Sequence, residues 1–170
     1  MKALILVDFQ NEWVDSNSEY YVGDISKAIE KTNILVNWAR KNEVKVIFTR
    51  HVEPGSTKEF ADSSKNSELI PEISRNDSDI VITKNKISPF YKTNLENELN
   101  GVDEIIIAGI LTNLCVRSLA ADAYDRDFGI IIIDDCCLAF TKEIHQFTLK
   151  DLKETRPEIQ ITKLDEFITS

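Results

Sequence analysis

Apolar residues follow two alternating patterns along this chain. Short uncharged runs, rich in isoleucine, leucine and valine, are typical of strands buried on both faces. Between these runs, apolar positions recur at the three-to-four-residue spacing of a helix face, as from Ile25 to Arg40. Strands are predicted over residues 3–7, 44–49, 80–83, 105–109, 130–133 and 160–162, and helices over 25–40, 93–99, 113–125, 142–154 and 164–168.

The alternation of strands and helices predicts the fold class. Strand–helix–strand units connect in a right-handed sense and build a parallel sheet with helices on both faces. We therefore expect an α/β protein, a three-layer α/β/α fold with a central parallel sheet of about six strands. The chain has 170 residues and no repeat or linker, so we expect residues 1–170 to form one domain.

Residues 52–66 depart from this pattern. They contain Pro54-Gly55-Ser56 and Asp62-Ser63-Ser64, show little periodicity and exceed the length of an ordinary connection. Loops of this length inside a compact domain usually bind ligands or act as lids. The segment is therefore predicted to be a binding loop or a lid.

Composition excludes several functions. The net charge of −9 and the absence of a basic block argue against a nucleic-acid or anionic membrane partner. The first apolar run ends at Asp8, too early for a signal peptide, and no run reaches membrane-spanning length, so a cytoplasmic protein is expected. Three cysteines, of which Cys136 and Cys137 are adjacent, make no disulfide framework, and we interpret that pair as small buried residues.

Cys115 is the candidate nucleophile. It lies in the segment 109–116, directly after the apolar run 105–108, where a buried strand is predicted to lead into a helix. With Thr112 or Asn113 as N-cap, Cys115 falls in the first helical turn, where the helix dipole favours the thiolate. The alternative is a buried cysteine that only packs, but the position at a strand's carboxyl end, where ligands bind in such sheets, favours the functional interpretation.

Two charged residues end other predicted strands. Asp8 follows the first strand and Lys84 the third, and the carboxyl ends of parallel strands meet at one edge of the sheet. Each residue alone is more typical of a solvated charge. Together with Cys115 they supply a base, a cation and a nucleophile: Asp8 could take the thiol proton, and Lys84 could stabilise both negative charges.

Three blocks of the chain carry a family resemblance. They are residues 3–13 with Asp8-Phe9-Gln10-Asn11, residues 84–95, and residues 109–135 around Cys115. In this order they resemble the isochorismatase-like cysteine hydrolases, which include nicotinamidase and N-carbamoylsarcosine amidase. The resemblance spans nearly the whole chain.

The resemblance implies a catalytic site. Its triad would be Asp8, Lys84 and Cys115, its oxyanion hole the backbone N–H groups of Leu111 and Cys115, and its cis peptide the Ile110–Leu111 bond. The implied chemistry is amide hydrolysis: the thiolate attacks a carbonyl, Asp8 protonates the departing ammonia, and water hydrolyses the thioester.

Departures from the family pattern concern the metal. Nicotinamidases bind one through an aspartate, a histidine two residues later and further histidines. Here Thr49 takes the aspartate position before His51, and the only other histidine, His145, lies in a late helix, where a structural role is expected. One imidazole is a poor ligand set for a divalent ion, so we expect no metal, no cofactor and a main substrate other than nicotinamide.

Four residues are predicted to contact substrate: Gln10, Trp13, His51 and Phe90. Trp13 and Phe90 match family positions that line the pocket, against the alternative of core packing. Gln10 could instead cap a strand end, and His51 could be an ordinary hydrogen-bonded histidine. Family members commonly form dimers or tetramers, so the resemblance also implies a homo-oligomer.

These observations favour a metal-independent cysteine amidohydrolase acting on a small amide, ureido or carbamoyl compound. One alternative is a nicotinamidase-type, metal-assisted hydrolase. The other is a catalytically weak small-molecule binder or scaffold with the same fold, although a binding module has no need for an activated thiol. The expected partners are a small-molecule substrate and further copies of the chain, with no nucleic acid and no membrane.

Overall fold

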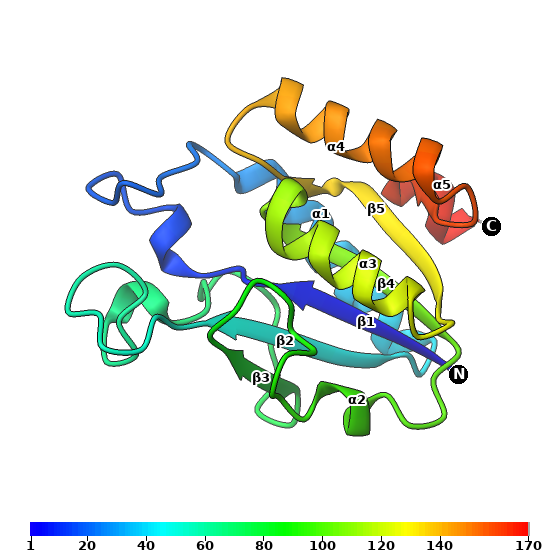
Figure 1. Cartoon of the computed structure of the whole chain (residues 1–170), viewed down its shortest axis with the longest axis horizontal. Helices are drawn as coiled ribbons and strands as arrows, with labels where there is room; N and C mark the ends of the chain where they lie inside the picture. The colour runs from blue at the N-terminus through cyan, green and yellow to red at the C-terminus, as the bar shows by residue number, and fades with distance from the viewer. Residues whose placement is uncertain (170) are drawn as a thin grey trace.

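The computed structural model describes residues 1–169 and has a six-stranded parallel sheet between two layers of helices (Figure 1). The strand order is β3-β2-β1-β4-β5-β6. The predicted three-layer α/β/α fold is confirmed. The strands are β1 (Lys2–Val7), β2 (Lys45–His51), β3 (Ile80–Lys84), β4 (Glu104–Ile110), β5 (Gly129–Leu138) and β6 (Gln160–Thr162).

The helices divide between the two faces of the sheet. α1 (Ser26–Lys41) and α5 (Leu164–Thr169) cover one face, and the other is covered by α2 (Leu95–Glu98), α3 (Arg117–Tyr124) and α4 (Lys142–Thr155). α2 is shorter than the predicted helix 93–99, since Thr93 uses its hydroxyl to bind Pro89 O and to accept from Leu95 N, which makes a turn.

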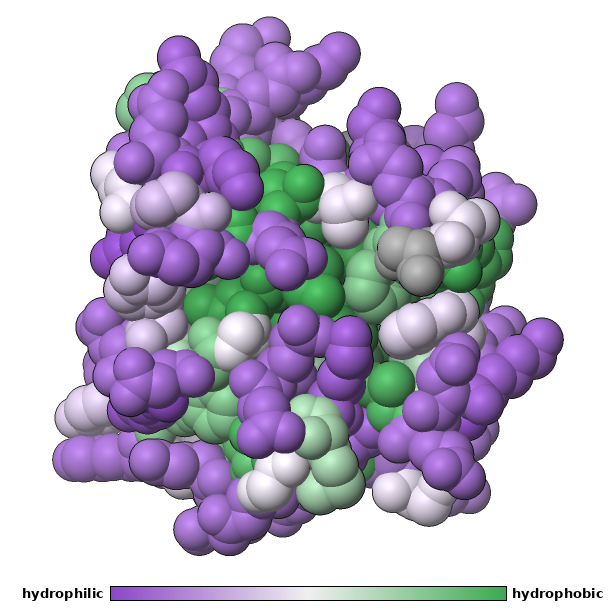
Figure 2. All heavy atoms as spheres, turned by 90° about the vertical axis from the view of Figure 1, so that its right-hand side faces the viewer, coloured by the Kyte–Doolittle hydropathy of each residue, from purple (hydrophilic) through white to green (hydrophobic). Residues whose placement is uncertain are grey.

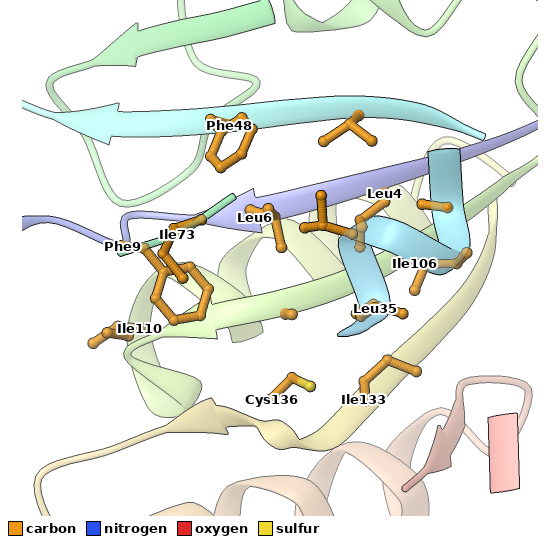
Figure 3. Close-up of a cluster of buried hydrophobic side chains, with 14 of the residues drawn as sticks. Leu4, Leu6, Phe9, Leu35, Phe48, Ile73, Ile106, Ile110, Ile133 and Cys136 are labelled. Atoms are coloured by element: carbon orange, nitrogen blue, oxygen red, sulfur yellow. The ribbon is translucent and has the colours of Figure 1, made fainter. Parts of the chain in front are cut away.

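Each face of the sheet has its own apolar cluster. Figure 3 shows Leu6, Ile106 and Ile133, from β1, β4 and β5, directed to the side where Leu35 of α1 packs. On the opposite face, Ile5 and Ile107 pack against Leu119 of α3. After their first residues, Lys2 and Glu104, the central strands β1 and β4 are buried on both sides, as the uncharged runs 3–7 and 105–109 predict.

β5 is longer than predicted. The sequence pattern ends the strand at Ile133, but pairing with β4 resumes beyond the two aspartates, where Cys137 lies opposite Gly109. Ile107 pairs with Ile132, so β5 has extra residues between these two pairs and bulges there. The bulge accommodates Asp134 and Asp135, while Cys136 and Cys137 are buried, as predicted for this pair.

Gly109 brings the ends of β1 and β4 together. Its φ is +147°, and a Cβ placed there would lie 2.3 Å from the carbonyl oxygen of Val7. No side chain fits in that space. The close approach sets the residue after Val7, which is Asp8, beside the segment that follows β4.

The amino ends of the strands and the N-terminus lie at the end of the molecule opposite to Asp8 (Figure 1). Figure 2, which faces that end, shows a central apolar area surrounded by hydrophilic residues. Within residues 1–169, no helix has the length and apolar character needed to cross a membrane.

Candidate functional site

Three strand ends bring Asp8, Lys84 and Cys115 into contact. The Nζ atom of Lys84 lies 2.7 Å from Asp8 Oδ2 and 3.4 Å from Cys115 Sγ. The side chains of Asp8 and Lys84 are 0% exposed, and Cys115 is 9% exposed. A buried ammonium therefore joins a carboxylate to a thiol, and the side chains of Asp8 and Lys84 are closed off from solvent.

Asp8 is held from three directions. Its φ is +51°, a left-handed conformation that is uncommon outside glycine. The backbone N–H of Asp8 donates to Thr49 Oγ1 (3.1 Å), and the Thr49 hydroxyl donates to Asp8 Oδ1 (2.5 Å). The carbonyl of Asp8 accepts the indole N–H of Trp13 (2.8 Å). These bonds fix both the backbone and the carboxylate of Asp8.

Lys84 remains an ammonium although it is buried. Burial by itself lowers the pKa of Lys84, but the charge of Asp8 and the hydrogen bonds to Asp8 and Cys115 raise it, and the net direction is upward. Its Nζ also lies 3.2 Å from the carbonyl of Lys86 and 3.4 Å from His51 Nδ1. Burial and the Lys84 charge lower the pKa of His51, so this ring is neutral at pH 7.

Cys115 is a neutral thiol in the resting site. Burial and the charge of Asp8 raise its pKa to about 12, and Lys84 offsets this only in part. The expectation that the helix dipole favours the thiolate is therefore wrong for the resting protein. The residue lies in a wide π-helical turn, Thr112–Val116, and burial is the largest effect on its pKa.

The start of that turn also differs from the predicted cap. The residue at the cap position is Leu111, which makes no side-chain capping bond, whereas Thr112 and Asn113 were the expected caps. The carbonyl of Leu111 accepts from Val116 N (3.2 Å), and the Thr112 hydroxyl bonds His145 Nδ1 (2.8 Å) instead. The Ile110–Leu111 peptide bond is cis.

Gln10 is fully buried, and its amide links two segments beside the site. Its Nε2 donates to the carbonyls of His51 (2.8 Å) and Ser67 (2.7 Å), and its Oε1 accepts from His51 N (2.7 Å). Both N–H groups are thus engaged with backbone. This geometry favours the strand-end role over a direct contact with substrate.

Aromatic rings gather beside His51. The Phe60 ring lies 5.2 Å from both the Trp13 and His51 rings, and Phe140 lies 6.3 Å from Trp13, between centroids. Phe60 belongs to the predicted binding loop, and its N–H donates to Glu12 Oε2 (3.0 Å), a carboxylate that is 2% exposed. Glu12 therefore anchors the loop over Trp13 and His51.

Phe90 lies in a different environment from the other three predicted contacts. It is buried in the same apolar cluster as Cys115. Its ring lies under the Arg126 guanidinium, 4.3 Å from the centroid, and stacks at 6.4 Å on Phe128. Arg126 and Phe128 both belong to the segment that follows α3, so this ring packs against that segment.

The residues beside Asp8, Lys84 and Cys115 do not fit a divalent metal. His51 faces the Lys84 ammonium with Nδ1, and its Nε2 lies 3.8 Å from Glu53, whose side chain is 59% exposed. The Thr49 hydroxyl is engaged with Asp8. Across the described part of the chain, no three His, Cys, Asp or Glu side chains gather in a way that could hold a metal ion.

Sequence reasoning missed three residues of this region. Thr49 was considered only as the replacement of a metal ligand, Glu12 was not considered, and His145 was assigned a structural role without a partner. Thr49 and Glu12 share one signal, a polar residue next to a segment that is otherwise buried. That signal indicates that the residue is constrained, but only the tertiary structure shows which residue it contacts.

The architecture is that of a three-layer α/β protein, with a buried polar cluster at the carboxyl ends of its parallel strands. Residues 2–162 match the model of the isochorismatase domain, so the chain belongs to the isochorismatase family of hydrolases.

Two sequence relatives and one solved structure illustrate the family. The chain is 30% identical to nicotinamidase 3 of Arabidopsis thaliana over 88% of this chain and 79% of that protein. It is 27% identical to the ureidoacrylate amidohydrolase RutB of Acinetobacter baylyi, over 89% of this chain and 76% of that protein. An isochorismatase-like hydrolase from Alkaliphilus metalliredigens has the same fold, with a TM-score of 0.88 and 23% identity. The match covers 99% of this chain and 97% of that chain.

Proposed function

We propose that this chain is a metal-independent cysteine amidohydrolase that cleaves the C–N bond of a small amide, ureido or carbamoyl compound. The main support is the position of the Lys84 ammonium, which contacts the Asp8 carboxylate at 2.7 Å and the Cys115 sulfur at 3.4 Å within one buried cluster. A structural ion pair has no need of a thiol, whereas a nucleophile with a base and a cation needs all three groups.

The first half of the proposed reaction forms a thioester. Because the Cys115 thiol is neutral at rest, its proton passes to Asp8 as sulfur attacks the substrate carbonyl. The backbone N–H groups of Leu111 and Cys115 hold the oxyanion, and Lys84 stabilises the negative charge while it is on sulfur. Collapse of the intermediate breaks the C–N bond, and Asp8 returns the proton to the departing ammonia.

The second half regenerates the thiol. Water attacks the thioester carbonyl and gives a proton to Asp8, the same N–H groups hold the second oxyanion, and the C–S bond breaks. Asp8 then returns the proton to the Cys115 sulfur. The acid product leaves, and no metal or redox cofactor takes part in any step.

Nicotinamide hydrolysis is the second candidate function, favoured by the 30% identity with nicotinamidase 3. The metal ligands expected for that class do not assemble around His51, and this favours other amides. Turnover of nicotinamide that a chelator abolishes would support this candidate against the first.

We also propose that the chain assembles as a homo-oligomer through the start of α4. Ile144 and Phe147, one helical turn apart, are 38% and 70% exposed, and Phe140 just before the helix is 43% exposed. Leu114, 41% exposed, lies on the π-helical turn that α4 contacts. Sedimentation analysis of the wild type and Phe147→Glu tests this, since a charge in that interface would yield monomers.

The proposed activity is tested by ammonia release from a panel of small amides, ureido acids, carbamoyl amino acids and nicotinamide. Release that Cys115→Ala abolishes, in a protein that melts at the wild-type temperature, is the expected result. Release that persists in Cys115→Ala would contradict the nucleophile assignment. A wild type that binds panel compounds without hydrolysing any of them would favour the binder or scaffold.

A further inference from the structure

We infer that His145 is a positioning residue that holds the turn carrying Cys115. It lies on α4 between Thr112 of the π-helical turn and Asp134 of the β5 bulge. The distances are 2.8 Å from Thr112 Oγ1 to His145 Nδ1, and 2.7 Å from His145 Nε2 to Asp134 Oδ1. The catalytic part of this inference rests on the proposed function.

The direction of both hydrogen bonds follows from Asp134. The bond from His145 lowers the pKa of Asp134 against the effect of burial, so this carboxylate is ionised and accepts from Nε2–H. In the neutral imidazole, Nδ1 then has no proton and accepts from the Thr112 hydroxyl. Asp134 thereby selects the tautomer of His145 that binds Thr112.

Thr112 connects this chain of bonds to the reacting groups. It is fully buried and follows Leu111, whose N–H is a proposed oxyanion donor, and its carbonyl accepts from the N–H of Arg117 across the turn. The turn has no side-chain cap of its own at Leu111. The His145 bond therefore anchors the first residue of the turn that presents both proposed oxyanion donors, while the Lys84 ammonium contacts Cys115 further along it.

α4 does not need this bond in order to pack. Its N-terminus is capped by the Thr141 hydroxyl, which accepts from Ile144 N (3.2 Å). Arg117 of α3 pairs with Asp151 at 2.5 Å, and Leu149 and Leu152 are buried against the sheet. Loss of the His145 bond is thus expected to loosen the turn and leave the helix in place.

Variants of Thr112 test the anchor, because valine keeps the shape of threonine and removes its hydroxyl. Thr112→Ser keeps the hydroxyl and should restore wild-type behaviour. The matched control is Thr148→Val, which removes a buried hydroxyl from α4 that bonds Ile144 O at 2.7 Å, away from the turn.

The first readout is amide hydrogen exchange of the peptide that spans residues 111–117, which needs no substrate. Exchange should be faster in Thr112→Val and in His145→Phe by about tenfold, and unchanged in Thr112→Ser and Thr148→Val. Unchanged exchange in both Thr112→Val and His145→Phe would overturn the inference. This result stands whether or not the protein hydrolyses amides.

The second readout compares turnover with thiol alkylation. If the anchor positions the oxyanion donors, Thr112→Val should lower kcat by about tenfold, a fraction of the ~10²–10³ lost with a whole donor. KM should stay within about twofold, as should alkylation of Cys115 by iodoacetamide, since alkylation forms no oxyanion. An unchanged kcat in Thr112→Val would overturn the catalytic part of the inference. If the alkylation rate of Cys115 fell as much as kcat, the effect would lie in the reactivity of the thiol and not in the oxyanion donors.

Discussion

The Thr49 hydroxyl and the Asp8 carboxylate form a closed pair at the ends of β2 and β1. Thr49 accepts the backbone N–H of Asp8 and donates to Asp8 Oδ1 at 2.5 Å. Both residues are 0% exposed. A carboxylate fixed in this way keeps Oδ2 directed at Lys84, which lies 2.7 Å away.

Thr49→Val is therefore expected to lower kcat/KM of the proposed hydrolase by about tenfold or more, because a hydrogen bond to a charged group contributes about 1.5–3 kcal/mol. Thr49→Ser should retain most of the activity. Steady-state kinetics of the two variants make the comparison. Equal activity in Thr49→Val and wild type would show that Asp8 does not depend on this hydroxyl.

Asp8→Asn should separate thiol reactivity from turnover. The charge of Asp8 raises the pKa of Cys115 and Lys84 lowers it, so removal of the carboxylate charge should lower the thiol pKa. Iodoacetamide should then alkylate Cys115 faster at pH 7.5, by about tenfold for each unit of pKa, while ammonia release is lost with the base. Alkylation rates followed by intact mass test this, and Asp24→Asn, a surface carboxylate change, is the control.

Stability should fall at alkaline pH. The pKa values of the Cys115 and Cys136 thiols rise from 9.0 to about 12 in the folded protein, mainly through burial. Above pH 9 the unfolded chain loses these protons and the folded chain keeps them, so stability is full below pH 9 and is lost as pH rises toward 12.

Thermal unfolding between pH 7 and pH 11 measures this loss. In Cys115→Ser the melting temperature should fall less with rising pH, because serine does not titrate in this range. Cys136→Ser should have the same effect independently. A melting temperature of the wild type that stays constant up to pH 11 would be incompatible with buried, neutral thiols.

Chelation should leave the activity unchanged. His51 and Glu53 offer one imidazole and one exposed carboxylate beside the Lys84 ammonium, which is a poor site for a divalent cation. Ammonia release should be the same before and after dialysis against EDTA, with metal content checked by mass spectrometry. Activity that disappears on dialysis and returns with a metal would overturn the metal-independent proposal.

Sequence reasoning identified the candidate triad residues because the carboxyl ends of parallel strands meet whatever their separation in the chain. It could not predict the pKa of Cys115. The helix dipole is visible in sequence, but burial of the thiol and the distance to Asp8 are not, and these two effects determine the direction of the shift.

The sequence pattern also did not predict the bulge in β5. Asp134 and Asp135 end the apolar run, so the pattern ends the strand there, while pairing with β4 resumes at Cys137. The pairing with β4 makes Asp134 and Asp135 part of β5, and that pairing cannot be read from the sequence of β5.

The sequence by itself determined the α/β class, the succession of strands and helices along the chain and the candidate residues for the chemistry, because these depend on local periodicity and on the general geometry of parallel sheets. The tertiary structure alone decided which hydroxyl holds Asp8, that Thr112 binds His145 and that the resting thiol is neutral. Those properties depend on distances and solvent exclusion between segments far apart in sequence, for which the linear pattern holds no signal.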